Sequence, residues 1–250
     1  MKHRWGVNLK TPSLPAERVS GAFAMPGEGK TELVRLLWTL FPRAIALDTQ
    51  VVDGKGEYPG IVARNPRELL KGIRKRLGEP RWKISYRGDV IPAIFDALAA
   101  IPNYLLVVEE ADKYGTGSHC PKGLYAMAHH GRRFGQALAL VSRRPANIAK
   151  DLTATIEGLY LWRAVEPGDR DYFKKRGTPM DILDSLERHQ SLRRFYGDDG
   201  TPNWSICKCN IPHLGGCQPI PGGSNGENKE AQKETAAEIL NPEVAAEIIE

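Results

Sequence analysis

The chain has 250 residues, of which 41% are hydrophobic, enough to bury one large domain or two small ones. No apolar run approaches the roughly 18 residues that span a bilayer. The first residues, Met1 to Trp5, lack the apolar stretch of a signal peptide. These features exclude a membrane-spanning chain and predict a soluble, intracellular, cytoplasmic protein whose four cysteines form no disulfide framework.

The net charge of +5 is unevenly distributed along the chain. Residues 227–250 hold seven Glu and two Lys, a local charge of −5, so residues 1–226 carry +10. A basic body suits a polyanionic partner such as nucleic acid, although a basic protein without such a partner has the same composition.

The chain divides into three regions. Residues 1–17 read as an irregular lead-in. Residues 18–196 alternate short apolar runs with helical patterns, which indicates βαβ units, an α/β fold and a mainly parallel sheet. Residues 197–250 have a composition that rarely packs a core, and we expect an extended, flexible Gly/Pro-rich and acidic tail.

Within the middle region the expected elements follow one another closely. Strands are expected at residues 18–24, 43–48, 103–109, 136–142 and 157–162. Helices are expected at residues 30–40, 66–77, 90–100, 121–133 and 168–177, with another beginning near Pro179. Residues 80–88 read as a short edge strand and residues 191–196 as a last strand.

The first functional motif, at residues 24–31, reads Ala-Met-Pro-Gly-Glu-Gly-Lys-Thr. It follows the phosphate-binding pattern G-x-x-x-x-G-K-[ST], with Ala24 at the first glycine position. Glycines let the backbone turn so that its N–H groups point at phosphate oxygens, and the following helix N-terminus attracts anions. The residues expected to bind the nucleotide are Pro26, Gly27, Glu28, Gly29, Lys30, Thr31 and Glu32.

Two side chains of this motif have specific tasks. Lys30 places a positive charge on the β- and γ-phosphates, and the Thr31 hydroxyl can ligate Mg²⁺. The alternative is a chance glycine-rich turn. The strand-like run at residues 18–24 argues against it, because phosphate loops follow a strand.

The second motif, at residues 104–112, reads Tyr-Leu-Leu-Val-Val-Glu-Glu-Ala-Asp. A hydrophobic strand that ends in two acids is the Walker B arrangement, and its C-terminal end is expected beside the phosphate loop. Glu109 would hold the Mg²⁺ shell, and Glu110 would activate the attacking water as general base. Alone, the same residues also fit a strand followed by a solvated acidic turn.

Two further sequence features concern the same predicted nucleotide site. The run Ala44 to Asp48 fits an extra strand between the two motif strands, which is typical of P-loop ATPases with a catalytic glutamate rather than of kinases or GTPases. Residues 129–145 predict a helix end, a glycine turn and an apolar strand. Ser142 or Arg143 would then lie at the sheet edge where a sensor of the γ-phosphate belongs.

Four segments resemble the FtsK/HerA superfamily of RecA-like DNA-pumping ATPases, which includes conjugation motors and packaging ATPases of some membrane-containing viruses. These segments are Leu47 to Tyr58 (Leu-Asp-Thr-Gln-Val-Val-Asp-Gly-Lys-Gly-Glu-Tyr), Val108 to Ala111 (Val-Glu-Glu-Ala), Gly131 to Gly135 (Gly-Arg-Arg-Phe-Gly) and Val141 to Pro145 (Val-Ser-Arg-Arg-Pro). The resemblance covers about residues 18–175. The chain departs from the family at Arg143, usually Gln, and at Ala24 and Glu109, which replace Gly and Asp.

The resemblance implies a three-layer RecA-like P-loop NTPase that hydrolyses ATP with Mg²⁺ as a homo-oligomer, usually a hexameric ring. In such rings an arginine of the next subunit stabilises the charge on the transferring phosphate. Arg163 and Arg170 are the first candidates, and Arg132 and Arg133 are alternatives. A surface arginine or a DNA phosphate contact is the competing interpretation for each of them.

The function implied is DNA-stimulated translocation of double-stranded DNA, most like a viral genome-packaging ATPase. A packaging role places the protein in the host cytoplasm or virion, with a capsid or portal-vertex protein as a further partner. A zonula occludens toxin-like phage morphogenesis ATPase and a nucleotide-binding assembly protein are alternatives. Basic clusters at residues 71–76 and 174–176 would contact DNA phosphates or form solvated helix faces.

Four residues near the C-terminus have side chains that ligate zinc in other proteins. They are Cys207, Cys209, His213 and Cys217. Structural zinc sites favour two to four residues between paired cysteines, so the single residue between the first two is too tight. Unpaired thiols are the favoured interpretation.

Overall fold

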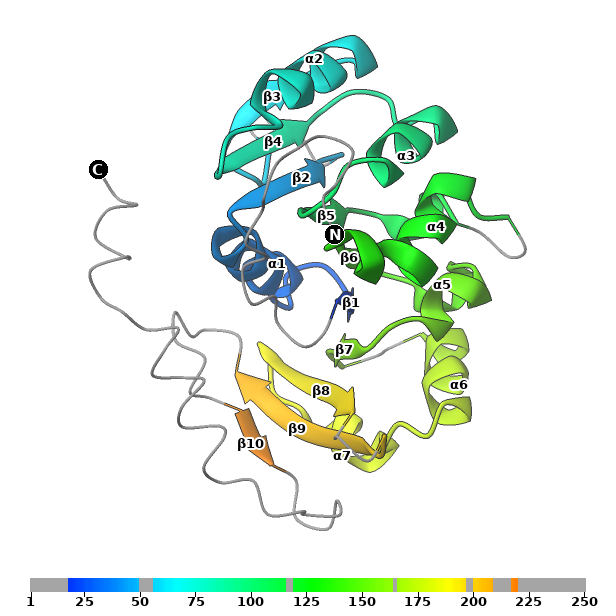
Figure 1. The fold of residues 1–250 in the computed structure, drawn as a ribbon. Helices are drawn as coiled ribbons and strands as arrows, with labels where there is room; N and C mark the ends of the chain where they lie inside the picture. Colours follow the sequence, from blue (N-terminus) through cyan, green and yellow to red (C-terminus); the bar gives the residue numbers. More distant parts are fainter. Residues whose placement is uncertain are drawn as a thin grey trace.

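The computed structural model describes residues 18–49, 56–115, 119–163, 166–196, 200–208 and 217–219. Its ten strands form one sheet in the order β10-β9-β8-β7-β1-β6-β5-β2-β4-β3 (Figure 1). All pairs from β7 to β3 are parallel, whereas β8, β9 and β10 extend one edge in antiparallel fashion. The predicted α/β fold with a mainly parallel sheet is confirmed.

The elements have the following bounds. The strands are β1 (Val19–Phe23), β2 (Arg43–Leu47), β3 (Ile61–Ala63), β4 (Trp82–Tyr86), β5 (Leu105–Val108), β6 (Ala137–Ser142), β7 (Gly158–Leu161), β8 (Gln190–Tyr196), β9 (Pro202–Lys208) and β10 (Cys217–Pro219). The α-helices are α1 (Lys30–Leu40), α2 (Pro66–Arg76), α3 (Pro92–Ala99), α4 (Lys122–His130), α5 (Lys150–Ala154), α6 (Pro167–Lys175) and α7 (Met180–Ser185). Short 3₁₀ helices are η1 (Ala111–Lys113), η2 (Gly131–Phe134) and η3 (Pro145–Asn147).

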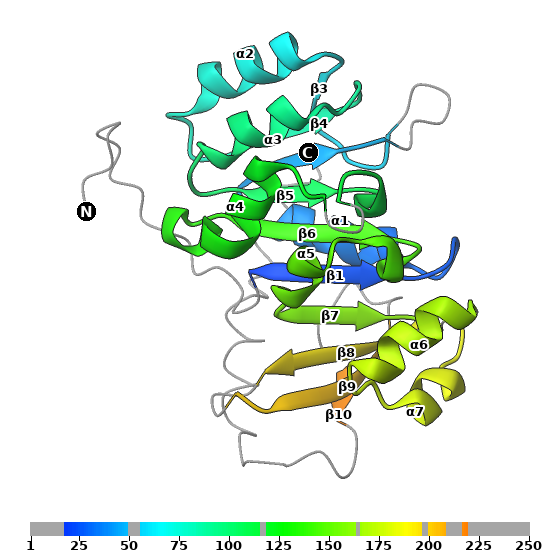
Figure 2. The ribbon, with the colours of Figure 1, turned by 90° about the vertical axis from the view of Figure 1, so that its right-hand side faces the viewer.

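Helices cover both faces of the sheet and make three layers. Successive residues of a strand point to opposite faces of the sheet. In this sheet the two faces carry side chains of different sizes. One face carries many small residues and packs on α1 through Val34 and Trp38; its alanines are Ala22, Ala44, Ala46, Ala137 and Ala139. The other face carries larger aliphatic side chains and packs on α2 to α7. Figure 2 shows α1 behind the sheet and α3 to α6 in front.

The positions of three strands correct the sequence interpretation. Residues 80–88 do not form an edge, because β4 pairs with both β2 and β3 and the three-residue strand β3 is the edge. The strand between the motif strands β1 and β5 is β6, while β2 lies beyond β5. Order along the chain does not determine order in a sheet when helical crossovers connect the strands.

The C-terminal part of the chain also differs from the expected tail. Residues 202–208 form β9, which pairs along the whole length of β8. An unpaired β8 would present a row of free backbone groups at the sheet edge, and β9 satisfies them. The expected lead-in at residues 1–17, and residues 209–216 and 220–250 of the expected tail, lie outside the described residues.

The state of Cys207 differs from the unpaired thiol that the sequence predicts. Cys207 is disulfide-bonded, and the backbone of Cys217 lies opposite it in the β9–β10 register. Cys209 and His213 lie outside the described residues. Within the described part of the chain, no group of three or more His, Cys, Asp or Glu side chains could hold a metal ion.

The described helices give one further finding. None of them combines the length and the apolar character needed to cross a membrane.

Candidate nucleotide-binding site

The loop between β1 and α1 has the backbone that an anion-binding turn requires. Gly27 and Gly29 have φ values of 81° and 107°, which side chains with a Cβ rarely adopt. Gly29 is the N-cap residue of α1, and the helix begins at Lys30. The first N–H groups of a helix have no intrahelical partner, so they are available to an anion here.

Lys30 lies partly buried against the loop itself. Its Nζ donates hydrogen bonds to the carbonyl oxygens of Ala24, at 2.8 Å, and Met25, at 3.2 Å. Burial lowers the pKa of Lys30, and the positive charge of Arg143 adds to this, while the negative charge of Glu109 opposes it. The lysine therefore places its charge in the loop and close to the second motif.

Glu109 directly follows β5, between β6 and β2, and only 4% of its surface is exposed. Its Oε1 accepts a hydrogen bond from the hydroxyl of Tyr58. Burial raises the pKa of Glu109, although this hydrogen bond and the charge of Lys30 oppose the shift. Lys30 and Glu109 thus lie at the same carboxyl edge of the sheet, and each shifts the pKa of the other.

Glu110 has a different environment from its neighbour. Its φ of 51° lies in the left-handed region, an unfavourable conformation for a non-glycine residue that is enriched at functional sites. Its Oε2 accepts a 3.1 Å hydrogen bond from Thr49 Oγ1 and forms an ion pair with Lys113. Burial would raise the pKa of Glu110, but these contacts and the charge of Arg143 lower it overall. The lowered pKa keeps this carboxylate ionised at neutral pH.

The C-terminal end of β6 places its polar residues between the two motifs. Ser142 is buried; its Oγ donates to Asp112 Oδ1 at 2.5 Å and accepts from the backbone N–H of Arg144 at 3.0 Å. Arg143 is exposed, and its charge lowers the pKa of both Lys30 and Glu110. Arg143 therefore acts electrostatically on both motifs, whereas the Ser142 hydroxyl is held by Asp112.

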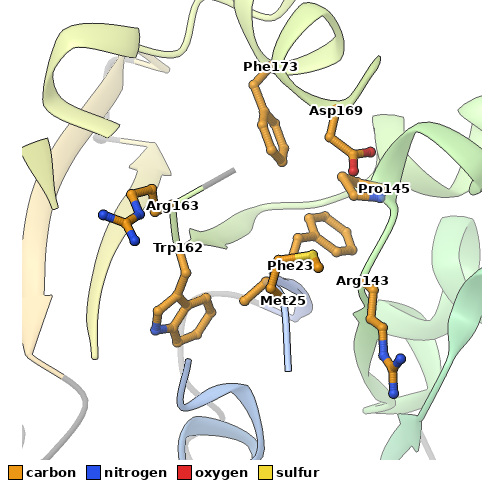
Figure 3. A pocket seen from close by; sticks show the side chains of 9 residues that line it. Phe23, Met25, Arg143, Pro145, Trp162, Arg163, Asp169 and Phe173 are labelled. Carbon is orange, nitrogen blue, oxygen red and sulfur yellow. The ribbon is translucent and has the colours of Figure 1, made fainter. Parts of the chain in front are cut away.

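A small pocket lies beside the loop, at the ends of β1, β6 and β7. Its lining includes Met25, Arg143, Trp162, Arg163 and Asp169. Figure 3 shows Arg143 and Arg163 on opposite sides of Met25. The structure therefore places Arg163 next to the loop of its own subunit.

The other candidate arginines lie on α6 and η2. Arg170, on α6, forms a bidentate ion pair with Asp184 of α7. Arg132 and Arg133 are exposed on η2, which precedes β6 and so lies at the sheet edge opposite the loop.

The two basic clusters lie on different parts of the surface. Residues 71–76 belong to α2, near β3 and β4, and residues 174–176 lie at the C-terminal end of α6, at the other end of the row of helices (Figure 1). On α2, Leu69 and Ile73 face the core, so the charged side chains of this amphipathic helix remain outside. One subunit therefore does not join the two clusters into a single track.

A buried polar network lies beside the second motif, and the sequence motifs did not predict it. Asp48, at the end of β2, is fully buried and accepts hydrogen bonds from Ser85 Oγ at 2.9 Å and from the backbone N–H groups of Glu57 and Tyr58. Arg87 Nε lies 3.6 Å from the same carboxylate. The sequence signal that could have indicated this network is Asp48 itself, an acid at the carboxyl end of a strand next to β5.

Replacing Gly56 by Ala is expected to destabilise the protein by about 1–3 kcal/mol. A Cβ at this position would overlap Asp48 Oδ2 and lie 2.7 Å from Arg87 Nε, so the buried ion pair would have to move. Denaturant unfolding would measure the change. Gly78→Ala is the control, because nothing lies within 4 Å of its Cβ, and equal stability of the two variants would contradict this account.

The side chains near the loop fit a magnesium ion. Mg²⁺ prefers oxygen ligands and is usually bound by one or two protein groups together with phosphates and waters. The Thr31 hydroxyl, on the first turn of α1, and the Glu109 carboxylate could supply such oxygen atoms.

Comparisons with known proteins find similarities in sequence and in fold. No protein-family model matches the chain. Over 87 residues the chain is 30% identical to the DNA double-strand break repair helicase HerA of Pyrococcus furiosus; this segment is 33% of the chain and only 16% of HerA.

Two solved structures have a similar fold. The genome packaging NTPase B204 of Sulfolobus turreted icosahedral virus 2, in complex with ATPγS, has a TM-score of 0.59 at 15% identity, with 82% of this chain and 98% of that chain covered. The DNA-packaging ATPase B204 of Sulfolobus turreted icosahedral virus has a TM-score of 0.58 at 13% identity, with 81% and 98% covered. The chain therefore shares the fold of these packaging NTPases and, over a short segment, sequence similarity with HerA, as the predicted resemblance implies.

Proposed function

We propose that the protein is an ATP-hydrolysing DNA translocase that packages a viral genome. The observation that supports it most is the meeting of the loop lysine and two strand-end glutamates at one sheet edge. Lys30 and Glu109 affect each other's pKa, and Arg143 links Lys30 to Glu110 electrostatically. This arrangement suits phosphoryl transfer, in which positioning and charge stabilisation supply most of the catalysis.

In the proposed reaction, different residues carry out different steps. The N–H groups of the loop and the ammonium of Lys30 bind the phosphates. A bound Mg²⁺, held by Thr31 and Glu109, would neutralise charge on the β- and γ-phosphates. The Glu110 carboxylate takes a proton from a water whose oxygen attacks the γ-phosphorus, while the bond to the β–γ bridging oxygen breaks and ADP leaves. Arg143, with Ser142, senses the γ-phosphate from the end of β6.

DNA is the proposed second partner. The +10 charge of residues 1–226 favours a polyanion, and the relative HerA and the structural neighbours B204 are named for DNA repair and genome packaging. Because the two basic clusters lie apart on one subunit, a continuous track requires several subunits, which fits a ring. A capsid or portal-vertex partner and a location in the host cytoplasm or virion belong to the same proposal.

The proposed ring needs an arginine that acts on the nucleotide of a neighbour. Arg163 lines a pocket with Met25 of its own loop, so we assign it a role within its own subunit. Arg132, Arg133 and Arg170 remain the candidates that act in trans. Of these, Arg170 would have to leave its ion pair with Asp184 to do so.

The ATPase rate with and without double-stranded DNA tests this function. We expect the DNA to raise kcat severalfold, with the effect weakening at high salt because phosphate contacts release counterions. Native mass measurement of the same sample should show a ring-sized oligomer. A rate that is insensitive to DNA would reject the translocase and favour a nucleotide-binding assembly protein.

A further inference from the structure

We propose that Tyr58 is a positioning residue for the Glu109 carboxylate: it holds one carboxylate oxygen so that the other is presented to the metal ion bound with the nucleotide. The inference rests on the proposed nucleotide site and adds to it a residue from outside both motifs.

The contacts of Glu109 are asymmetric. Tyr58 is fully buried, and its hydroxyl donates a hydrogen bond to Glu109 Oε1. Within the described part of the chain, Glu109 Oε2 has no hydrogen-bond partner, although it belongs to a residue that is almost fully buried. This oxygen is not one of the fully enclosed polar atoms that lack a partner, so it is still accessible to a ligand. The charge of Lys30 acts on the same carboxylate, so a metal ion bound with the phosphates at the loop would be near enough to use the free oxygen.

Tyr58 is itself held by the helix that follows the phosphate loop. Its ring packs on Trp38 of α1 with centroids 5.3 Å apart, and Trp38 Nε1 donates to the Pro59 carbonyl at 3.2 Å. Arg35, one turn earlier on α1, forms an ion pair with Glu57. The carboxylate of Asp48, at the end of β2, accepts hydrogen bonds from the backbone N–H groups of residues 57 and 58. Residues 57–59 therefore connect α1 with the end of β5.

The length of the acidic side chain explains why such an anchor is needed. Glutamate has one more rotatable bond than the aspartate usually found at this position of the motif. The carboxylate of a glutamate without a partner would sample several positions. The entropy lost when the metal orders that side chain would weaken metal binding. The hydrogen bond from Tyr58 removes that freedom before the metal arrives, as outer-shell partners do for metal ligands elsewhere.

Tyr58→Phe tests the inference, because it removes the hydroxyl and keeps the ring against Trp38. Two quantities are measured on the whole protein: ADP affinity in EDTA by calorimetry, and Mn²⁺ affinity of the protein–ADP complex by electron paramagnetic resonance. We expect unchanged ADP affinity in EDTA and Mn²⁺ affinity lower by roughly 10- to 100-fold. The effect should disappear when Glu109 is already Gln, as a double-mutant cycle would show.

Tyr104→Phe is the matched control. Tyr104 is equally buried, but its hydroxyl donates to the Leu98 carbonyl at the opposite end of β5. This variant should bind Mn²⁺ like the wild type, even if both variants unfold at lower temperature. Unchanged Mn²⁺ affinity in Tyr58→Phe, or an equal loss in Tyr104→Phe, would overturn the inference alone. A wild-type protein that binds no ADP would instead overturn the proposed function and this inference with it.

Discussion

Replacing Glu110 by Gln is expected to lower kcat for ATP hydrolysis by about 100-fold or more, with little change in ATP affinity. Glutamine keeps an oxygen that can accept the hydrogen bond from Thr49, but it cannot take a proton from water. The lowered pKa of Glu110 keeps the wild-type carboxylate ionised, so the variant removes a base that is present at neutral pH. Single-turnover kinetics with labelled ATP would separate the hydrolysis step from binding.

Glu109→Gln is the comparison that distinguishes the two acids. We expect it to weaken Mg²⁺-dependent binding, because Glu109 lies by Lys30 and is buried, whereas Glu110→Gln should trap bound ATP. Glu79→Gln, an exposed substitution between α2 and the start of β4, at the sheet edge opposite the loop, controls for the general effect of removing a carboxylate. If Glu110→Gln hydrolyses ATP at the wild-type rate, another group is the base and the assigned roles are wrong.

Replacing Lys30 by Ala is expected to abolish hydrolysis and to weaken ATP binding by about 10- to 150-fold. The estimate follows from the roughly 1.5–3 kcal/mol that a charged hydrogen bond contributes. In the protein, Lys30 Nζ donates to the Ala24 and Met25 carbonyl oxygens, so the ammonium is already placed in the loop. Titration with a fluorescent ATP analogue, together with a steady-state phosphate-release assay, would measure both effects.

Lys71→Ala is the control for this prediction. Lys71 is exposed on α2, away from the loop, and the variant removes the same charge without touching the site. It should bind and hydrolyse ATP like the wild type. An active Lys30→Ala protein would place the nucleotide site elsewhere and remove the basis of the motor proposal.

The elements that position the loop and the second motif could be predicted because their signals are local. Gly27, Gly29 and Lys30 follow a strand and open a helix, and a buried run that ends in Glu109 and Glu110 reads as a central strand. Parallel strands place their carboxyl ends at one edge, so the meeting of Lys30 and Glu109 follows from the strand directions alone. The short strand β3, without clear alternation, and β9, in a Gly/Pro-rich region, lack such signals.

The sequence by itself determined the fold class and predicted the phosphate loop and the two acids, since each depends on residues that are neighbours in the chain. Only the tertiary structure decided that β6 separates the motif strands and that Tyr58 anchors Glu109. The physical reason is that strand order and side-chain partners depend on crossovers and packing between distant segments. Tyr58 and Glu109 are 51 residues apart, and no local periodicity reports a contact over that separation.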